Sequence, residues 1–209
     1  MDPRQRRSRD RLHRAVLELA ASRPVDEVTM TAIAEAAGVH RSTVHDHADS
    51  PGELVRAALS AELDVLRAGL PEPGAIPEEV ARAVTEITRG VVDHVLRHRA
   101  IYRVGLGDGA PGYGLPGMLS RHFRESGRIL REVSGVDIEV DVAGHPHAAV
   151  AASAARFIAD GTVGLLAEWI ATDSTRAEDF LDVYGALLPD WWPRLATVEG
   201  SAPEGGAVS

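Results

Sequence analysis

The sequence predicts an all-α protein with a short N-terminal three-helix domain and a longer helical body. Apolar residues recur every three to four positions through most of the chain, which is the spacing of one face of an amphipathic helix. Helix start signals stand before several of these segments, and glycine and proline collect in the stretches between them. The predicted elements follow in chain order.

The first helix is expected over residues 8–22, ending before Pro24, because proline disfavours helical backbone in the residue before it. Residues 1–14 carry six arginines against two aspartates, and we expect residues 1–7 to form a flexible basic arm. Such an arm would suit a nucleic-acid backbone, and the alternative is a solvated, frayed terminus. The buried stripe of this helix would consist of Leu12, Ala15, Val16, Leu19 and Ala20.

A sharp turn between two short helices is predicted at Gly38. Thr29 is a suitable N-cap for the first of them, because its hydroxyl can accept from an N–H of the first turn. Gly38 can adopt the positive φ that a helix C-terminus requires, and Val39 can bury the apolar contact that accompanies it. The apolar residues at helical spacing before the turn are Ile33, Ala34 and Ala37.

The second short helix is expected over residues 41–47 and is polar on most of its surface. Val44 is its one large apolar residue and is expected to point to the core, whereas His40 is a weak N-cap. The polar groups can reach phosphates or base edges of DNA, and the alternative is a solvated helix face. With two neighbouring threonines, the candidate contact residues are Thr29, Thr31, His40, Arg41, Ser42, Thr43, His45, Asp46 and His47.

A long amphipathic helix is predicted to begin at Ser50. Ser50 can cap it, Pro51 suits the first helical position, and Glu53 can reach back to the cap N–H. Two short helices around a glycine turn are typical of a helix-turn-helix domain, which presents one helix to the major groove. The apolar face of the long helix would consist of Val55, Leu59, Leu63, Leu66 and Leu70.

Residues 8–56 resemble the DNA-binding domain of the TetR family of bacterial transcriptional regulators. The residues that carry the resemblance are Thr29, the run IAEAAGV from Ile33 to Val39, Ser42, Thr43, His47 and the segment from Ser50 to Leu54. The sequence departs from the family pattern where His45, Asp46 and Ala48 replace aromatics around the histidine, and where Pro51 replaces a common lysine. Asp46 would repel a phosphate and is better suited to a cytosine amino group.

The resemblance implies a homodimer that binds a pseudo-palindromic operator in double-stranded DNA, most often as a repressor released by a small-molecule inducer. Phe157, Gly161 and Trp169 resemble the C-terminal part of the family, in which the last two long helices of each subunit form a four-helix bundle. Ordinary packing within one chain is the alternative. We call the helix-turn-helix domain the reader. Two readers related by a two-fold axis would contact half-sites about 34–36 Å apart, or a multiple of that distance.

A DNA-binding domain is therefore expected at residues 1–56 and a helical ligand-binding and dimerisation domain at residues 57–195, with a disordered tail at residues 196–209. A capping box of Thr175 and Glu178 would start the last helix. The helices of the body are expected at residues 78–98, 100–106, 118–134, 147–172 and 175–188, and its connections at residues 71–77, 107–117 and 135–146.

A ligand pocket is predicted among the helices of this second domain. Aromatic residues make up only 4% of the chain, so the few rings present are expected to weigh in any ligand contact. The candidate ligand-binding residues are Tyr102, Met118, His122, Phe123, Arg156, Phe157, Asp160 and Trp169.

The net charge of −9 is unevenly distributed along the chain. Residues 1–60 hold nine arginines and nine acids, whereas residues 61–209 hold 13 arginines and 22 acids, so the acidic body is expected to stay off DNA. The absence of cysteine excludes disulfides, thiol catalysis and thiolate metal sites. With no run expected to span a bilayer and no secretory signal, we predict a cytoplasmic protein.

Other kinds of chemistry are only weakly indicated. His94 and His98 are four residues apart on a helix and could share a metal ion, but two exposed histidines are the more common case, and we predict neither a metal nor a cofactor. No serine lies in a G-x-S-x-G elbow, and we therefore do not predict an enzyme. A small-molecule hydrolase is the alternative from another class of protein. A further alternative is a regulator-like helical scaffold with weak or lost operator binding.

Overall fold

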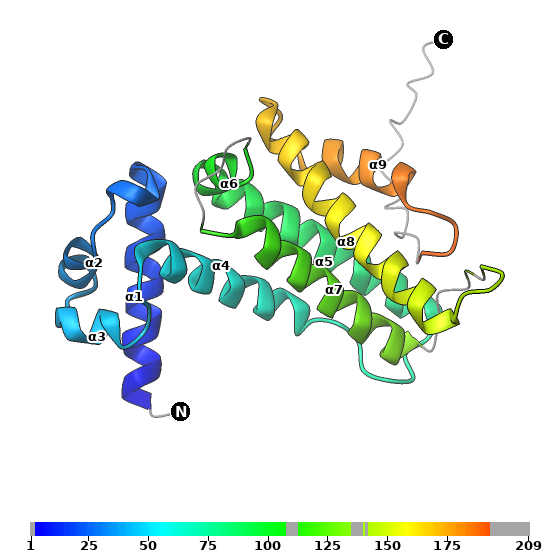
Figure 1. Ribbon diagram of the computed structural model, residues 1–209, viewed down its shortest axis with the longest axis horizontal. Coiled ribbons are helices and arrows are strands. Elements are labelled where there is room, and N and C mark those ends of the chain that lie inside the picture. Colours follow the sequence, from blue (N-terminus) through cyan, green and yellow to red (C-terminus); the bar gives the residue numbers. More distant parts are fainter. Residues whose placement is uncertain (1–2, 108–112, 135–139, 141, 193–209) are drawn as a thin grey trace, which may run out of the picture.

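The computed structural model describes residues 3–107, 113–134, 140 and 142–192, and all regular structure in these residues is helical (Figure 1). The all-α prediction is confirmed. The elements are α1 (Pro3–Ser22), the 3-10 turn η1 (Val25–Glu27), α2 (Met30–Ala37), α3 (Arg41–His45), α4 (Pro51–Arg67), α5 (Pro77–Arg97), α6 (Arg99–Gly105), α7 (Leu115–Ser134), α8 (His147–Ala171) and α9 (Ala177–Leu187). The predicted tail at 196–209 lies outside the described residues, as do residues 108–112 of the connection at 107–117 and residues 135–139 and 141 of the connection at 135–146.

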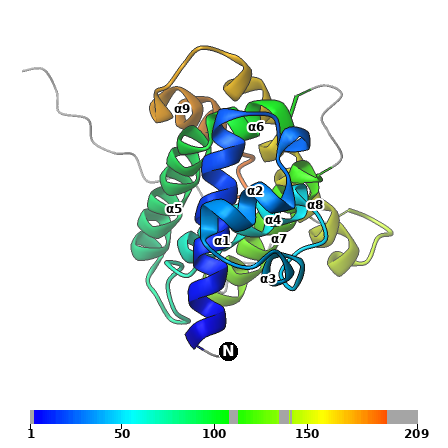
Figure 2. The same cartoon turned by 90° about the vertical axis from the view of Figure 1, so that its left-hand side faces the viewer.

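Helices α1 to α3 form a small N-terminal domain, and α4 runs from this domain into the helical body (Figure 1). Figure 2 looks onto the N-terminal domain, with α1, α2 and α3 in front of the body. Helix α1 packs against α2, α4 and α6, while α4 also packs against α5 and α7. Because α4 contacts both parts of the molecule, a change in the body can reach the N-terminal domain through this helix, as it can through the contact between α1 and α6.

One hydrophobic core extends from α1 to α9. In the N-terminal domain it contains Leu12, Ile33 and Val44, all fully buried, and α4 adds Leu59 and Leu63. Burial of each such side chain contributes roughly 1.5–3 kcal/mol to folding. The short helices α2 and α3 depend on this packing, because helices of eight and five residues are not stable alone.

Two helices begin earlier than the sequence predicts. Helix α1 begins at Pro3 rather than at residue 8, since arginine is a good helix former and the segment before residue 8 is rich in it. Residues 3–7 are therefore exposed helix rather than a flexible arm. Helix α7 begins at Leu115 rather than at residue 118, because proline is tolerated in a first turn and Pro116 can lie there.

The predicted capping box of Thr175 and Glu178 is wrong. Helix α9 has Arg176 at its N-cap position, and the hydroxyl of Ser174 accepts from the Arg176 N–H at 3.2 Å. Glu178 is instead ion-paired with Arg89 of α5, with 2.7 Å between Oε1 and Nη1. The ion pair between two helices therefore engages the Glu178 carboxylate, which the sequence pattern had assigned to the helix cap.

Helix α8 is long and apolar enough to cross a membrane by length and composition alone, contrary to the expectation of no such run. Its alanines, valines, leucines and isoleucines keep the mean hydropathy high although the stretch contains Arg156 and Asp160. Only 22% of that stretch is buried in the structure. The helix packs along α7 and against α6 and α9, and its other side is uncovered.

Candidate DNA interface and ligand cavity

The turn between α2 and α3 has the geometry that the sequence predicts. The Thr29 hydroxyl accepts from an N–H of the first turn of α2 at 3.1 Å. Gly38 has φ 60° and ψ 45°, which is the left-handed region, and the N–H of Val39 donates back to a carbonyl of α2 at 3.0 Å. Arg11 of α1 donates from Nη2 to the carbonyl of Gly38 at 2.7 Å, which fixes the turn to the first helix.

Helix α3 exposes a polar strip. Val44 is fully buried and holds the helix on the core, whereas the side chains around it face solvent. No described part of the chain covers this surface. The predicted contact residues Thr29, Thr31, His40, Arg41, Ser42, His45 and Asp46 are exposed, and Thr43 and His47 are half-buried. Helix α3 ends at His45, so Asp46 and His47 lie in the turn that follows.

The start of α4 confirms the predicted cap, with one changed partner. The Ser50 hydroxyl accepts from the N–H of Glu53 at 3.2 Å, and Pro51 occupies the first helical position. The Glu53 carboxylate accepts from the N–H of Asp49 at 2.8 Å, one residue before the predicted partner. Ala48, one of the departures from the family pattern, is buried, so this position is part of the core rather than of the exposed strip.

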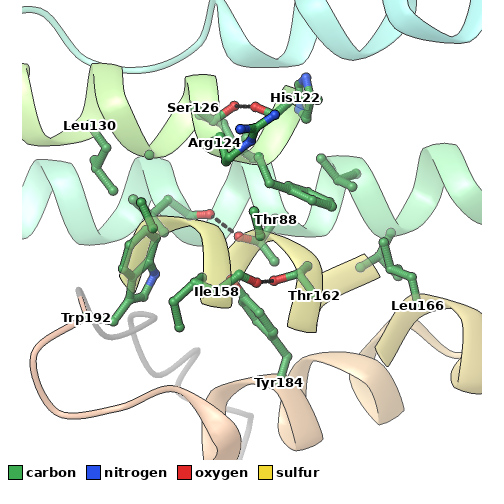
Figure 3. Close-up of a pocket in the computed structure, with 18 of the residues that line it drawn as sticks. Thr88, His122, Arg124, Ser126, Leu130, Ile158, Thr162, Leu166, Tyr184 and Trp192 are labelled. Carbon is green, nitrogen blue, oxygen red and sulfur yellow. Dashed lines mark hydrogen bonds between the residues drawn. The ribbon is translucent and has the colours of Figure 1, made fainter. Parts of the chain in front are cut away.

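A cavity of about 80 Å³ lies in the helical body among α5, α7, α8 and α9 (Figure 3). Its lining is mostly apolar, with Leu130, Ile158 and Leu166 among the side chains that face it. The serine and threonine hydroxyls in the lining already donate to carbonyls of their own helices. These hydrogen bonds join Thr88 to Val84 at 2.7 Å, Thr162 to Ile158 at 2.7 Å and Ser126 to His122 at 2.9 Å. Such a lining suits an apolar molecule better than a sugar or a nucleotide.

The structure brings two of the eight predicted ligand-binding residues to this cavity, His122 and Phe123. Tyr102 and Met118 are buried and do not line it, and Trp169 packs against Phe180, with 5.4 Å between ring centroids. Arg156, Phe157 and Asp160 lie on the exposed side of α8, where Arg156 pairs with Asp160.

Sequence reasoning missed Thr88, Tyr184 and Trp192, which also line the cavity. Thr88 lies on the helical face of α5 that also carries Val84 and Val91, so the periodicity could have identified it. Trp192 follows the last described helix and carries no periodic signal. Only the tertiary fold places its ring against Gly127 of α7, where an added Cβ would come within 3.1 Å of the ring.

His122 connects the cavity to α4. Its Nδ1 lies 3.3 Å from Nη1 of Arg67, and Arg67 in turn donates to Asp64 at 2.7 Å. Burial, followed by the nearby charge of Arg67, lowers the pKa of His122 to about 4. The imidazole is therefore neutral at pH 7, and its Nδ1 can accept from the Arg67 guanidinium.

An open groove rich in arginine adjoins the cavity and shares His122, Arg124 and Ala155 with it. Arg121 and Arg124 make no hydrogen bond or ion pair with any described residue. The Nη1 atom of Arg131 is buried, and no partner for it exists within the described ranges. Arg67 and Arg128 complete the set of five arginines, and they pair with Asp64 and Glu125, which also line the groove and leave it with an excess of positive charge. The groove is therefore suited to an anion.

His94 and His98 are not the two exposed histidines that the sequence reading preferred. Both lie against Glu62 of α4, whose Oε2 is 3.1 Å from Nδ1 of His94 and 2.9 Å from Nε2 of His98. Burial, followed by the charge of His98, lowers the pKa of His94 to about 4. Burial alone would raise the pKa of Glu62, but the hydrogen bonds and charges of the two histidines together outweigh it, and the pKa is lowered.

The outer side of α8 and α9 carries apolar side chains without cover. Phe157 is 73% exposed, and Leu187 of α9 is 67% exposed. A Cβ added at Gly161 or Gly164 would meet nothing within 4 Å in the described chain, so these glycines leave the α8 surface open to close approach. Exposed apolar faces of this kind are typical of subunit interfaces.

The comparisons with known proteins agree with this geometry. Residues 13–58 match the family described as bacterial regulatory proteins, tetR family. A TetR transcriptional regulator from Rhodococcus sp. RHA1 is similar in structure with a TM-score of 0.57 and 21% identity, over 87% of this chain and 93% of that chain. A tetR-family regulator from Streptomyces coelicolor has a TM-score of 0.53 and 21% identity, over 89% and 84%.

The fatty acid degradation regulator FadR from Bacillus halodurans is similar with a TM-score of 0.50 and 14% identity, over 86% of this chain and 99% of that chain. A search of curated protein sequences found no match. The segment matched by the family contains the helix-turn-helix and the start of α4. The chain therefore carries the N-terminal helix-turn-helix domain of the tetR family of bacterial regulatory proteins and has the fold of TetR-family transcriptional regulators.

Proposed function

We propose that this protein is a sequence-specific, cytoplasmic transcriptional repressor that leaves its operator when a small molecule binds in the helical body. The observation that supports operator binding is the polar strip of α3, exposed beside a turn held by Thr29, Gly38 and Arg11. Hydroxyl, imidazole and guanidinium groups on that strip can reach base edges and phosphates. The arginines on the exposed first turns of α1 add sequence-independent attraction to the backbone.

The active form is proposed to be a homodimer through α8 and α9. Phe157, Gly161 and Leu187 lie on an uncovered apolar surface that a second copy would bury. A two-fold axis would place two α3 helices on successive turns of one face of the duplex, so the operator is expected to be pseudo-palindromic. Dimerisation doubles the contacts that one five-residue helix can make.

The inducer is proposed to be an apolar molecule with an acidic end. The apolar cavity between α5, α7, α8 and α9 would take the chain, and the adjoining arginine groove would take the charge. Arg124 lines both, and the buried Nη1 of Arg131 lacks a partner in the described structure. A buried guanidinium nitrogen without an acceptor is costly, so an anion that satisfies it gains binding energy.

Operator binding is tested by a gel shift on the DNA that flanks the protein's own gene, at about 50 and 200 mM salt. We expect a shift that weakens strongly as salt rises and that is lost in Arg41→Ala. Arg176→Ala is the control, because this exposed arginine lies at the start of α9, away from the reader. A wild-type protein that gives no salt-sensitive shift would instead support the alternative of a helical scaffold without operator binding.

Inducer chemistry is tested with decanoate and decanol, which share a chain length and differ in charge. Tryptophan fluorescence can report binding, because Trp192 lines the cavity. We expect decanoate to bind more tightly than decanol, and Arg124→Met to weaken decanoate alone. Equal affinity for the two compounds in the wild-type protein would contradict the proposed acidic end.

A further inference from the structure

Three metal-ligating side chains from two helices meet at one point beside α4. Glu62 comes from α4, His94 comes from the last turn of α5, and His98 is the C-cap residue directly after that helix. One ligand atom from each lies within 4.8 Å of the other two, and both histidine nitrogens lie about one hydrogen-bond length from the same carboxylate oxygen, at 3.1 and 2.9 Å. His94 is 1% exposed, so the cluster is anchored in the interior.

The spacing of these atoms is close to that of a metal's inner ligands. Two ligand atoms at about 2.0–2.1 Å from a tetrahedral zinc ion lie roughly 3.3 Å apart. The present separations of 3.1 and 2.9 Å from Glu62 Oε2 therefore need only small adjustments to admit an ion. His98 follows His94 by four residues at the C-cap of α5, and both rings reach the same side of the helix end, as two histidines at this spacing do in helical metal sites.

A fourth residue holds one of the rings in place. The hydroxyl of Tyr102, on α6, lies 2.8 Å from Nε2 of His94, and this tyrosine is fully buried. The contact keeps Nδ1 of His94 turned toward Glu62. A hydroxyl can donate or accept, so it accommodates the tautomer in which Nδ1 is free to bind a cation and Nε2 carries the hydrogen. Partners of this kind orient metal-ligating histidines in proteins.

The cluster is also reachable from solvent. An open groove between α1 and α4 is lined by Glu62 and His98, and by His13 of α1. Arg97 lies 3.4 Å from the same Glu62 oxygen but is 65% exposed, so its side chain can turn into solvent when a cation enters. The groove offers an ion a path of entry and space for a water as a further ligand.

We propose that Glu62, His94 and His98 form a binding site for a divalent transition-metal ion of the zinc class. Two imidazoles with one carboxylate favour zinc and its neighbours over magnesium or calcium, which prefer oxygen ligands alone. The ion would link α4 to the C-terminal end of α5, beside the groove between α1 and α4. Because α4 carries the reader, metal binding would also change operator affinity, and this last step rests on the proposed function.

The zinc affinity of the full-length protein is measured by competition with a chromophoric chelator. The visible absorption spectrum of the protein with cobalt(II) then reports the coordination of the ion. We expect one equivalent of zinc to bind, magnesium not to compete, and cobalt(II) to show the intense bands of a four- or five-coordinate site. His98→Gln and Glu62→Gln should each weaken zinc by tenfold or more, since loss even of an outer partner costs about 10–100-fold. Far-UV circular dichroism confirms that each variant is helical.

His145→Gln is the matched control, because it removes an exposed histidine outside the cluster. Its zinc affinity should equal that of the wild-type protein. Zinc binding that is unchanged in both His98→Gln and Glu62→Gln, or absent from the wild type, would overturn the proposal. Zinc binding that depends on the cluster but leaves operator affinity unchanged would support the site and reject the coupling. A protein without operator binding would still give the zinc result, so the two proposals fail separately.

Discussion

The Nδ1 atom of His122 lies 3.3 Å from Nη1 of Arg67, so a residue in the wall of the cavity is hydrogen-bonded to the helix that carries the reader. His122 belongs to α7, whereas Arg67 is the last residue of α4. A ligand that displaces the imidazole would break this bond or pull on it. The free energy available for moving α4 equals the difference in ligand affinity between the two arrangements.

Arg67→Met is expected to reduce this coupling. The substitution keeps an apolar stem on α4 but removes the contact with His122, so decanoate should release operator DNA less effectively. The measurement is operator affinity with and without decanoate, together with the decanoate affinity of the DNA-free protein. Arg128→Met is the control, since Arg128 lies in the same groove but pairs with Glu125 and Glu132 of its own helix. Equal release of DNA in Arg67→Met and the wild type would refute the proposed link.

Gly38→Ala is expected to destabilise the protein by ~1–2 kcal/mol. Gly38 has a φ of 60°, which carries a penalty of about this size for a residue with a Cβ, and the new methyl would lie 2.6 Å from Nη2 of Arg11. Urea unfolding followed by circular dichroism measures the change. Gly117→Ala is the control, because it lies in α7 with nothing within 4 Å of an added Cβ, and should be neutral or stabilising by up to about 1 kcal/mol. Equal stability of Gly38→Ala and the wild type would contradict the turn geometry.

Stability is expected to fall as the pH drops from about 6.5 to about 4, and His122 accounts for part of the loss. The pKa of His122 is lowered from 6.5 to about 4 in the folded protein, so over this range the unfolded chain binds a proton that the folded chain excludes. The contribution is fully present above pH 6.5, and its loss amounts to about 3 kcal/mol once both states are protonated. Arg67 and Asp64 are the charged groups that face the ring from α4.

Unfolding free energies at pH 7 and pH 4.5 test this prediction. His122→Gln cannot take up the proton, so its stability should change less between the two pH values than that of the wild type. His145→Gln, which alters an exposed histidine, should keep the wild-type difference. Parallel pH profiles for His122→Gln and the wild type would show that the imidazole is not the group excluded from protonation.

Phe157→Asp is expected to prevent formation of the proposed dimer. Phe157 is 73% exposed on α8 beside the open surface at Gly161, and a charge there would be buried without a partner in a two-fold interface. Sedimentation equilibrium measures the mass in solution. Val65→Asp is a matched control, since Val65 is also 73% exposed but lies on α4. A dimer that survives Phe157→Asp as fully as Val65→Asp would place the interface elsewhere.

Local signals predicted the N-terminal domain closely because its geometry is set by neighbouring residues. The Thr29 cap, the left-handed Gly38, the buried Val44 and the Ser50 cap each follow from side chains within a few positions. The family resemblance then predicted DNA binding as the role of this turn. The sequence analysis also expected all four long helices of the body to within a few residues.

The ligand-binding region could not be predicted in the same way, because the cavity is assembled from four helices. Phe157 was chosen for its ring, but its position on α8 turns it outward, whereas Trp192 reaches the cavity only through tertiary packing. The histidine pair shows the same limit. The spacing of His94 and His98 was visible, but Glu62 comes from another helix, 32 residues before His94.

The most direct test is the affinity of wild-type protein and Thr43→Ala for operator DNA and for a scrambled duplex, measured by fluorescence anisotropy at fixed salt. Thr43 lies half-buried in the middle of α3, and loss of a base contact there is expected to cost ~1–3 kcal/mol on the operator alone. Affinity for the scrambled duplex should not change. Unaltered operator affinity in both Thr43→Ala and Arg41→Ala would contradict the central claim that the exposed side of α3 reads DNA.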